Sequence, residues 1–423
     1  MILLALSLQA VAAPSVAMVS EKRDIVVIGT PLKDSERYWQ ACRKRHCPPD
    51  EEIKAALIHG ENLFVAGDYR QSRAVLNATI ANTRGSEARF PVAVSDLRRA
   101  EARVATHMGE TDDVRRGMVA SRDALKAGLG AKDQRTLAQR LQIGDSMMLE
   151  GPQSMSSGPN MFYNDYRLGA LRAYESVARD AEQLDLPEIR GRAMIRVASL
   201  LTVLAAGNPS AYETRARAAL RRITDTTDPR LAVFRDAAVL LGGRMDIARG
   251  DPGAVDRLVA SYKGPPSDRP VLLYAPPIDW NASHDRTAAA AGVIAASGTG
   301  HTDAGHADEW IDVTFVVRPD GRVEDVEMLR ESGNRRSDWV GPVLQQIAGR
   351  RYAPLMVETG APGQMRVERH TYTASWGGGT GSRIRKQVGK PRVVVLDLTA
   401  EQSAGPPVTR PVPATASGVA PRG

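Results

Sequence analysis

Apolar residues follow a helical spacing over most of residues 35–263. After Pro48-Pro49 they repeat along one helix, Gly67-Asp68 interrupts the pattern, and it resumes at Tyr69. Prolines at the first positions and acidic residues in the first turn are typical of a helix start. The apolar positions of this first pair are Ile53, Leu57, Leu63, Phe64, Val75, Leu76 and Ile80. Similar patterns predict further amphipathic helices at 93–108, 114–125, 165–185, 187–206 and 210–223.

The hydrophobic period changes from helical to alternating in residues 310–376. Residues 310–317 alternate, and an Asp-Gly pair at Asp320-Gly321 follows, which supplies the positive φ of a tight hairpin turn. A second strand is expected from Val323 to Met328, a helix at 337–350, and a third strand within 365–376. The order strand, turn, strand, helix, strand predicts a small αβ domain.

The whole chain is therefore predicted to be α+β, with a helical array preceding the αβ domain. Pro-, Ala- and Gly-rich stretches mark its linker and tail. The predicted boundaries are a signal peptide at 1–17, an extended lead-in at 18–34, a helical repeat-like domain at 35–263, a linker at 264–307, an αβ domain at 308–376, and a flexible tail at 377–423 with one further strand at 391–398.

The helix–Gly-Asp-Tyr–helix unit at 49–82 resembles a tetratricopeptide repeat. Gly60 and Ser72 stand where that repeat packs its two helices closely, whereas Arg84 stands where proline is common. A second unit is expected after a period of about 42 residues, and Gly250-Asp251 repeats the turn. The resemblance implies a solenoid that binds a partner. An irregular helical bundle is the alternative.

The C-terminal domain resembles the corresponding domain of the TonB energy-transducer family. The segments that carry the resemblance are "WIDVTFVVRPDGRVEDVEMLRESG", "GRRYAPL" and "GQMRVERHTYTASW". The resemblance implies a periplasmic module that binds an extended segment of an outer-membrane receptor by strand addition. The last strand would be the binding edge, with Arg366, Val367, Arg369, Thr371 and Thr373. The alternative is that residues 391–398 cover this edge and make the domain purely structural.

The N-terminus and the cysteines indicate export. Residues 1–17 combine a short apolar core with small residues at two candidate cleavage positions, although no basic residue precedes the core. The chain has 2 cysteines, Cys42 and Cys47, and a pair in an exported chain is usually a disulfide. A redox pair, a metal site with His46, and two free thiols are the alternatives. No apolar run is long enough to predict a membrane span in the mature chain.

Candidate chemistry is sparse. The sequence contains no nucleophile elbow, P-loop, paired-histidine zinc helix or dinucleotide fingerprint, so no catalytic residues and no cofactor are predicted. The best metal candidate is the run His301, Asp303, His306, Asp308 and Glu309, which is interpreted as a solvated loop rather than a metal site. The net charge is +7, but the basic residues are scattered, which argues against nucleic-acid binding.

These observations favour a non-enzymatic periplasmic adaptor. Its helical array and its TonB-like domain would each bind a partner, one of them an envelope protein such as an outer-membrane receptor. The alternative is a structural envelope protein that binds peptidoglycan or an anionic glycan through its Arg-rich helices. An enzyme with an unrecognised site is a third hypothesis, and a homodimer through the C-terminal sheet is left open.

Overall fold

The structure is a computed structural model of the full chain. It describes residues 31–149, 161–262, 264, 269–280, 309–332, 339–357, 363–373, 376–378, 385–387 and 392–399. The predicted signal peptide, most of the lead-in, and the metal candidates His301, Asp303, His306 and Asp308 lie outside these residues.

Helices occupy the first part of the chain, as predicted. They are α1 (Leu32–Lys44), α2 (Pro49–Ala66), α3 (Tyr69–Asn82), α4 (Pro91–His107), α5 (Thr111–Leu129), α6 (Gln134–Met147), α7 (Met161–Gln183), α8 (Pro187–Gly207), α9 (Pro209–Thr224), the 3-10 helix η1 (Pro229–Phe234), α10 (Arg235–Ala248) and α11 (Ala254–Ser261). In the described part of the chain, no helix is both long and apolar enough to cross a membrane.

The turn between α2 and α3 forms as its residues predict. Gly67 ends α2 with a φ of 88°, and the Asp68 side chain caps α3 by accepting from the backbone of Gln71. Where the two helices cross, the Ser72 hydroxyl donates to the carbonyl of Gly60 at 2.7 Å. The close approach predicted at Gly60 and Ser72 is therefore confirmed. Whether the helix pairs are tetratricopeptide repeats remains a prediction.

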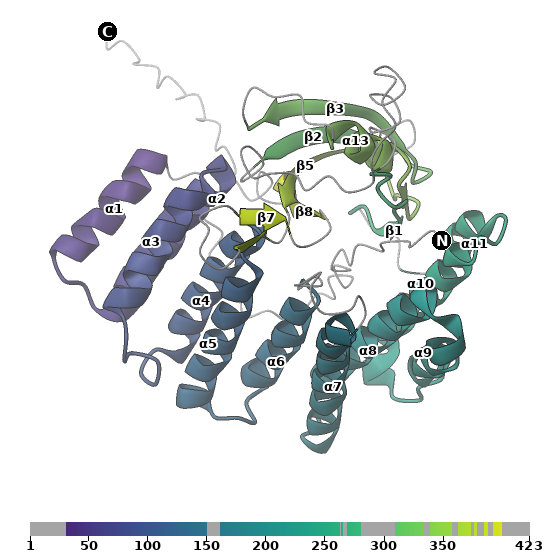
Figure 1. Cartoon of the computed structure of the whole chain (residues 1–423), viewed down its shortest axis with the longest axis horizontal. Coiled ribbons are helices and arrows are strands. Elements are labelled where there is room, and N and C mark those ends of the chain that lie inside the picture. The colour runs from purple at the N-terminus through teal and green to yellow at the C-terminus, as the bar shows by residue number, and fades with distance from the viewer. Residues whose placement is uncertain are drawn as a thin grey trace, which may run out of the picture.

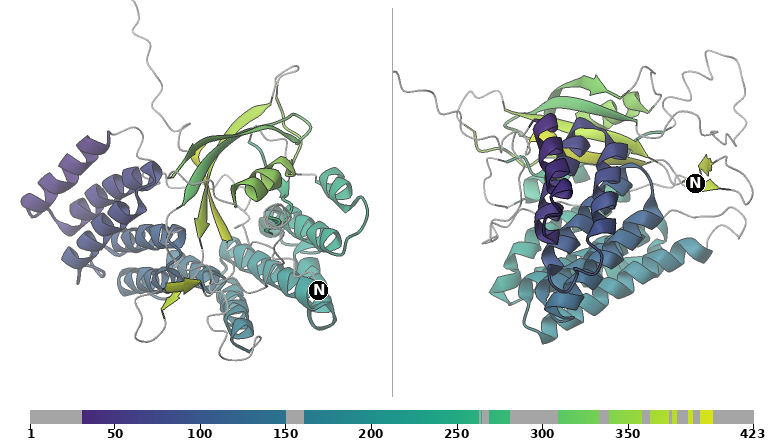
Figure 2. Two further views of the ribbon diagram at one scale, coloured as in Figure 1. Left: turned by 45° about the horizontal axis from the view of Figure 1, so that its top comes forward. Right: turned by 90° about the vertical axis from the view of Figure 1, so that its left-hand side faces the viewer.

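The helices follow one another in an arc, which Figures 1 and 2 show from three directions. Apolar side chains of α2–α5 form one core cluster, and those of α6–α10 form a larger one. Ion pairs also join successive helices: Arg73 of α3 binds Glu101 of α4, and Arg140 of α6 binds Asp180 of α7. Much of the arginine content therefore connects helices to each other.

The C-terminal domain contains a four-stranded antiparallel sheet. Its order is β3–β2–β5–β8, with β2 (Trp310–Val317), β3 (Val323–Glu331), β5 (Gln364–Thr373) and β8 (Arg392–Asp397). The helix α13 (Val340–Ala348) packs on one face, where alternate residues of β2 are buried. Gly321 has a φ of 81° in the β2–β3 turn, as predicted. The α+β class, with helices first and antiparallel strands near the C-terminus, is confirmed.

Four short strands form two small pairs beside the main sheet in the described structure. β1 (Leu272–Tyr274) pairs with β4 (Arg351–Tyr352), and β6 (Trp376–Gly378) pairs with β7 (Arg385–Gln387). In Figure 2 the main sheet lies across the hollow side of the helical arc, between the early helices and α10–α11. The two ends of the array thus both lie near the C-terminal domain.

Candidate functional site: the junctions between sheet and helical array

The five residues predicted as an unpaired edge all lie on β5, but β5 is not an edge strand. It pairs with β2 from Gln364 to Thr371 and with β8 from Glu368 to Thr373. The Thr399 hydroxyl extends this contact, since it accepts from the Val367 amide at 2.6 Å and donates to the Val367 carbonyl. The prediction of a free edge at Arg366, Val367, Arg369, Thr371 and Thr373 is therefore wrong. Residues 392–397 cover it, which was the stated alternative.

The same strand instead carries the first junction with the helical array. The guanidinium group of Arg369 binds both carboxylate oxygens of Asp312, at 2.7 and 3.1 Å, and both side chains are fully buried. Arg369 also donates to the carbonyls of Phe64 and Val65 at the end of α2, and lies 3.9 Å from the centre of the Trp310 ring. One buried cation thus joins two strands and a helix C-terminus, where a positive charge is favourable.

Thr371 makes the next contact along β5. Its hydroxyl lies 2.9 Å from the Tyr69 hydroxyl and 2.9 Å from Nδ1 of His107. All three side chains are buried, and Phe64 packs against both rings. Burial, together with the nearby cations Arg103, Arg369 and Arg392, lowers the pKa of His107 to about 3. His107 is therefore neutral at physiological pH and acts here as a hydrogen-bonding group.

Gly67 makes the junction sterically close. A Cβ atom at this position would lie 2.7 Å from the indole ring of Trp310. The positive φ that ends α2 and the close approach of the ring both exclude a larger residue. The Gly-Asp-Tyr turn that resembles a repeat signature is thus also the surface on which the sheet packs.

A second junction joins the other end of the array to the C-terminal domain. Arg244 of α10 donates from Nε and Nη2 to the carbonyl of Leu273 in β1, at 3.1 and 3.0 Å. Around it, Leu240 and Leu258 from the helices form a core cluster with Leu273 and Ala353. Because β1 pairs with β4, this contact connects α10 and α11 to the sheet domain.

The opposite face of β5 contains a second buried polar group. Glu368 accepts from Arg350 at 2.8 Å and lies 3.2 Å from Nε2 of His370. Burial alone would raise the pKa of Glu368, but the charge of Arg350 and the hydrogen bond with His370 outweigh it and lower the pKa to about 2. Desolvation lowers the pKa of His370. All three side chains are buried, so this group stabilises the domain and is not accessible to a substrate.

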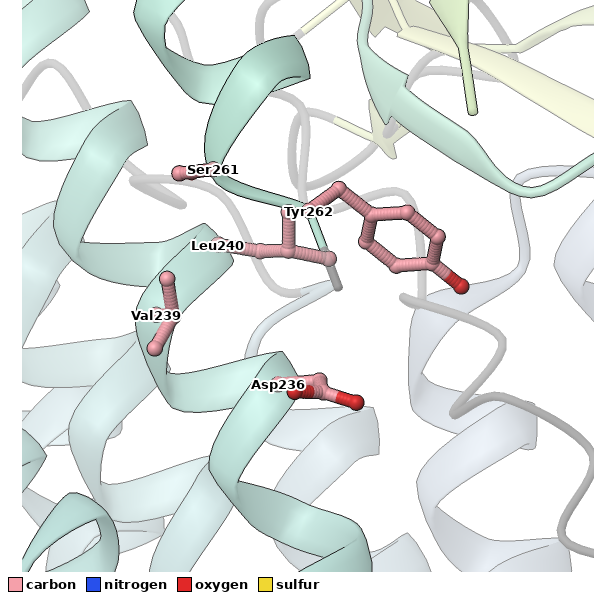
Figure 3. Close-up of a pocket in the computed structure, with 5 residues that line it drawn as sticks. All are labelled: Asp236, Val239, Leu240, Ser261 and Tyr262. Carbon is pink, nitrogen blue, oxygen red and sulfur yellow. The ribbon is translucent and has the colours of Figure 1, made fainter. Parts of the chain in front are cut away.

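A surface hollow lies beside α10 and α11 (Figure 3). Its volume is about 270 Å³, and it is lined by Asp236, Val239, Leu240, Ser261 and Tyr262. Burial and the charge of Asp236 raise the pKa of Tyr262, so this phenol is a poor base at neutral pH. The hollow contains one carboxylate and no histidine or lysine, and it does not form a recognisable catalytic set.

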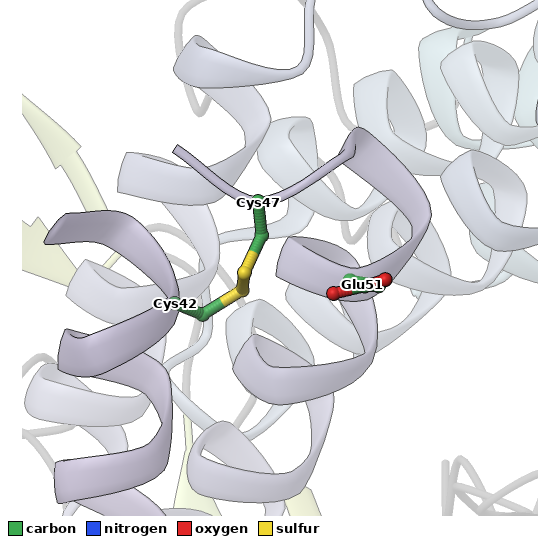
Figure 4. Close-up of side chains that lie close together, drawn as sticks. All are labelled: Cys42, Cys47 and Glu51. Carbon is green, nitrogen blue, oxygen red and sulfur yellow. A yellow bond between two sulfur atoms is a disulfide. The ribbon is translucent and has the colours of Figure 1, made fainter. Parts of the chain in front are cut away.

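Cys42 and Cys47 form a disulfide, as predicted (Figure 4). Glu51 lies within 4.8 Å of the sulfur atoms, but both sulfurs are bonded to each other and are not available as metal ligands. The remaining metal candidate in the described part, Glu309, accepts a hydrogen bond from the indole of Trp339 at 3.0 Å.

The junction residues could be recognised only in part from the sequence. Asp312 and Arg369 are oppositely charged residues in two strands of alternating pattern. Opposite charges on neighbouring strands often face each other. Nothing in the local pattern connects them with Phe64, Tyr69 or His107, about 300 residues away. No protein-family model matches the chain, and no curated protein matches it.

Proposed function

We propose that this chain is an exported, non-enzymatic protein-binding adaptor of the cell envelope, in which the array and the sheet form one body. The observation that carries the proposal is the buried guanidinium of Arg369, which binds Asp312 within the sheet and the carbonyls of Phe64 and Val65 in α2. A domain that satisfies a buried charge with groups of the helical array is not a flexibly tethered module. The array and the sheet therefore present a partner with one surface of fixed geometry. The disulfide is compatible with an oxidising compartment.

The surface we propose for the partner is the edge strand β3. Met328 and Leu329 expose 43% and 52% of their surface there. Register shifts interrupt the β2–β3 ladder, and Asp325 has a φ of 52°. Bulges and charged side chains on an edge strand disfavour nonspecific pairing with a strand of another chain. A partner at β3 would therefore be selected by side chains, with basic residues facing Glu327 and apolar residues facing Met328 and Leu329.

The identity of the partner follows only from the resemblance to TonB-type domains, which implies an outer-membrane transport receptor. Strand addition at β5 is not part of this proposal, because β8 occupies that edge. Coupling to an energy source is not part of it either.

A pull-down from detergent-solubilised envelope tests the proposal. The wild-type chain is compared with Leu329→Glu and with a matched control, Val233→Glu, which changes an exposed valine of η1. We expect envelope proteins to be enriched by the wild type and the control, and lost with Leu329→Glu. The same proteins captured by all three chains would exclude β3 as the partner surface. No specific envelope protein with any of them would contradict the adaptor function itself.

The alternative, glycan binding through the Arg-rich helices, receives little support from the array as a whole. Many of its arginines pair with acidic residues of the same or a neighbouring helix, including Arg73, Arg103, Arg140, Arg196 and Arg217. Such cations are already neutralised and are weak ligands for an external polyanion. Co-sedimentation of the protein with cell-wall sacculi that is weakened by salt and depends on α3–α9 would instead favour glycan binding.

A further inference from the structure

The helix α1 buries only one narrow stripe of side chains against the rest of the helical array. It lies at the end of the helical arc and packs on α2 (Figure 1). Ser35 and Cys42 are buried, Trp39 is half-buried, and the remaining residues of the helix are exposed. The spacing of four and then three residues places these inward side chains on one line along the helix.

A row of cations occupies the opposite side of α1. At about 100° per residue, Lys33, Arg37, Gln40 and Lys44 lie opposite the buried stripe, and all four are exposed. The row is about 16 Å long, from a rise of roughly 1.5 Å per residue. Among the described residues, no ion pair neutralises Lys33 or Lys44. Arg37 pairs with Asp34 at 3.3 Å but remains 79% exposed.

The helix dipole does not explain this row. Basic residues near a helix C-terminus are favourable, which accounts for Arg43 and Lys44. Lys33 lies in the first turn, where a positive charge is unfavourable, and Arg37 lies in the next. Neither contributes to the packing of α1 on α2, because both point away from it. The pair with Asp34 gives Arg37 a role within the helix, whereas the stability of the helix does not explain Lys33.

The disulfide fixes the end of the row. The four residues between Cys42 and Cys47 are Arg43, Lys44, Arg45 and His46, and all are exposed. The bond ties the last turn of α1 to the residues that precede α2 (Figure 4). A helix of 13 residues with one narrow buried stripe would otherwise be marginal. The disulfide therefore keeps a weakly packed, highly charged helix in place.

We infer that the outward row of α1 binds a linear anionic polysaccharide of the envelope. The row is only one side chain wide, because the acidic residues Asp34 and Glu36 flank it on either side. A flat anionic surface would also approach these acids, whereas a thin chain lying along the helix would meet only the cations. Carboxylates or phosphates that recur along a polymer suit a row of three cations. This inference does not depend on the adaptor function.

Binding of the full chain to linear polygalacturonate, with neutral dextran as the control polymer, tests the inference. The triple variant Lys33→Gln, Arg37→Gln, Lys44→Gln removes the row. The triple variant Lys126→Gln, Arg221→Gln, Arg222→Gln removes three exposed cations elsewhere and changes the net charge equally. A cation near an anionic surface contributes roughly fivefold in affinity. We therefore expect the first triple to weaken binding by about 100-fold at low salt, and the second by less than about fivefold.

Three results would overturn the inference. Equal weakening by both triples would indicate binding by net charge alone. No binding of the wild type to polygalacturonate would exclude the polysaccharide. Binding to phosphatidylglycerol vesicles or to duplex DNA that depends on the row, without binding to polygalacturonate, would assign α1 to a membrane surface or a nucleic acid instead. Circular dichroism of each variant confirms that the helices are retained.

Discussion

At the scale of single residues, the buried pair Arg369–Asp312 is the most consequential interaction. Arg369→Ala would leave the fully buried carboxylate of Asp312 with Arg330 as its one ionic partner among the described residues. Removing one partner of a buried ion pair lowers the free energy of unfolding by about 3–5 kcal/mol. Because Arg330 remains paired with Asp312, we expect a loss of about 3 kcal/mol, which urea unfolding measures. The control Arg322→Ala removes an exposed pair with Asp320 and should cost less than about 1 kcal/mol. An equal loss of unfolding free energy in the two variants would contradict the role of Arg369.

Gly67 tests the closeness of the junction. Gly67→Ala combines a positive φ with a contact of 2.7 Å to the Trp310 ring. Gly85 has a similar φ of 82°, but no atom lies within 4 Å of a Cβ added there. Gly85→Ala therefore measures the cost of the positive φ alone, about 1 kcal/mol of unfolding free energy. We expect Gly67→Ala to destabilise the protein by at least 1 kcal/mol more than Gly85→Ala, and the excess to disappear in a Trp310→Ala background. An excess that persists without Trp310 would place the strain elsewhere.

His107 makes the junction sensitive to acid. Its pKa is about 3 in the folded chain and 6.5 for an unperturbed histidine. Between these values the unfolded chain binds a proton that the folded chain does not, so stability is full above pH 6.5 and falls as the pH drops toward 3. The slope is at most about 1.4 kcal/mol per pH unit. Urea unfolding of His107→Gln should show a slope smaller by up to this amount between pH 6 and 4, because the other histidines are unchanged. Identical slopes would contradict the assignment.

At the scale of elements, hydrophobic patterning predicted most of the secondary structure. Proline starts, a Gly-Asp break and an Asp-Gly turn are local signals, and they placed α2, α3 and the β2–β3 hairpin. Strand order is not local. The alternation of 365–376 is compatible with an edge or a central strand, and only the pairing with 392–397 decides between them. The sequence pattern identified that segment as a strand without identifying its neighbour.

The strand β8 shields the sheet from self-association. Truncation before residue 391 would expose the backbone groups of β5, and an unpaired edge is a template for pairing with another chain. We expect this variant to form concentration-dependent dimers or larger species in analytical ultracentrifugation. The matched control ends after Thr399, keeps β8, and should retain the association state of the full chain. A truncated chain that remains monomeric at the same concentrations would contradict the shielding role.

At the scale of the whole molecule, the C-terminal domain connects α2–α4, near one end of the helical arc, with α10 and α11 at the other. Arg369 and Thr371 contact α2–α4, and Leu273 with Ala353 packs on α10 and α11. The separate domains expected from the sequence are therefore joined by buried contacts. This arrangement underlies the proposed adaptor, because a partner would bind a surface of fixed geometry.

Native-state hydrogen exchange of the wild type and of Arg369→Ala tests this central claim most directly. Regions that open together lose protection together. We predict that amides of β5 and of α2–α4 both exchange faster in the variant, while α7 and α8 change little. Faster exchange confined to β5, with α2–α4 unchanged, would mean that the sheet is an independent module and would contradict the account.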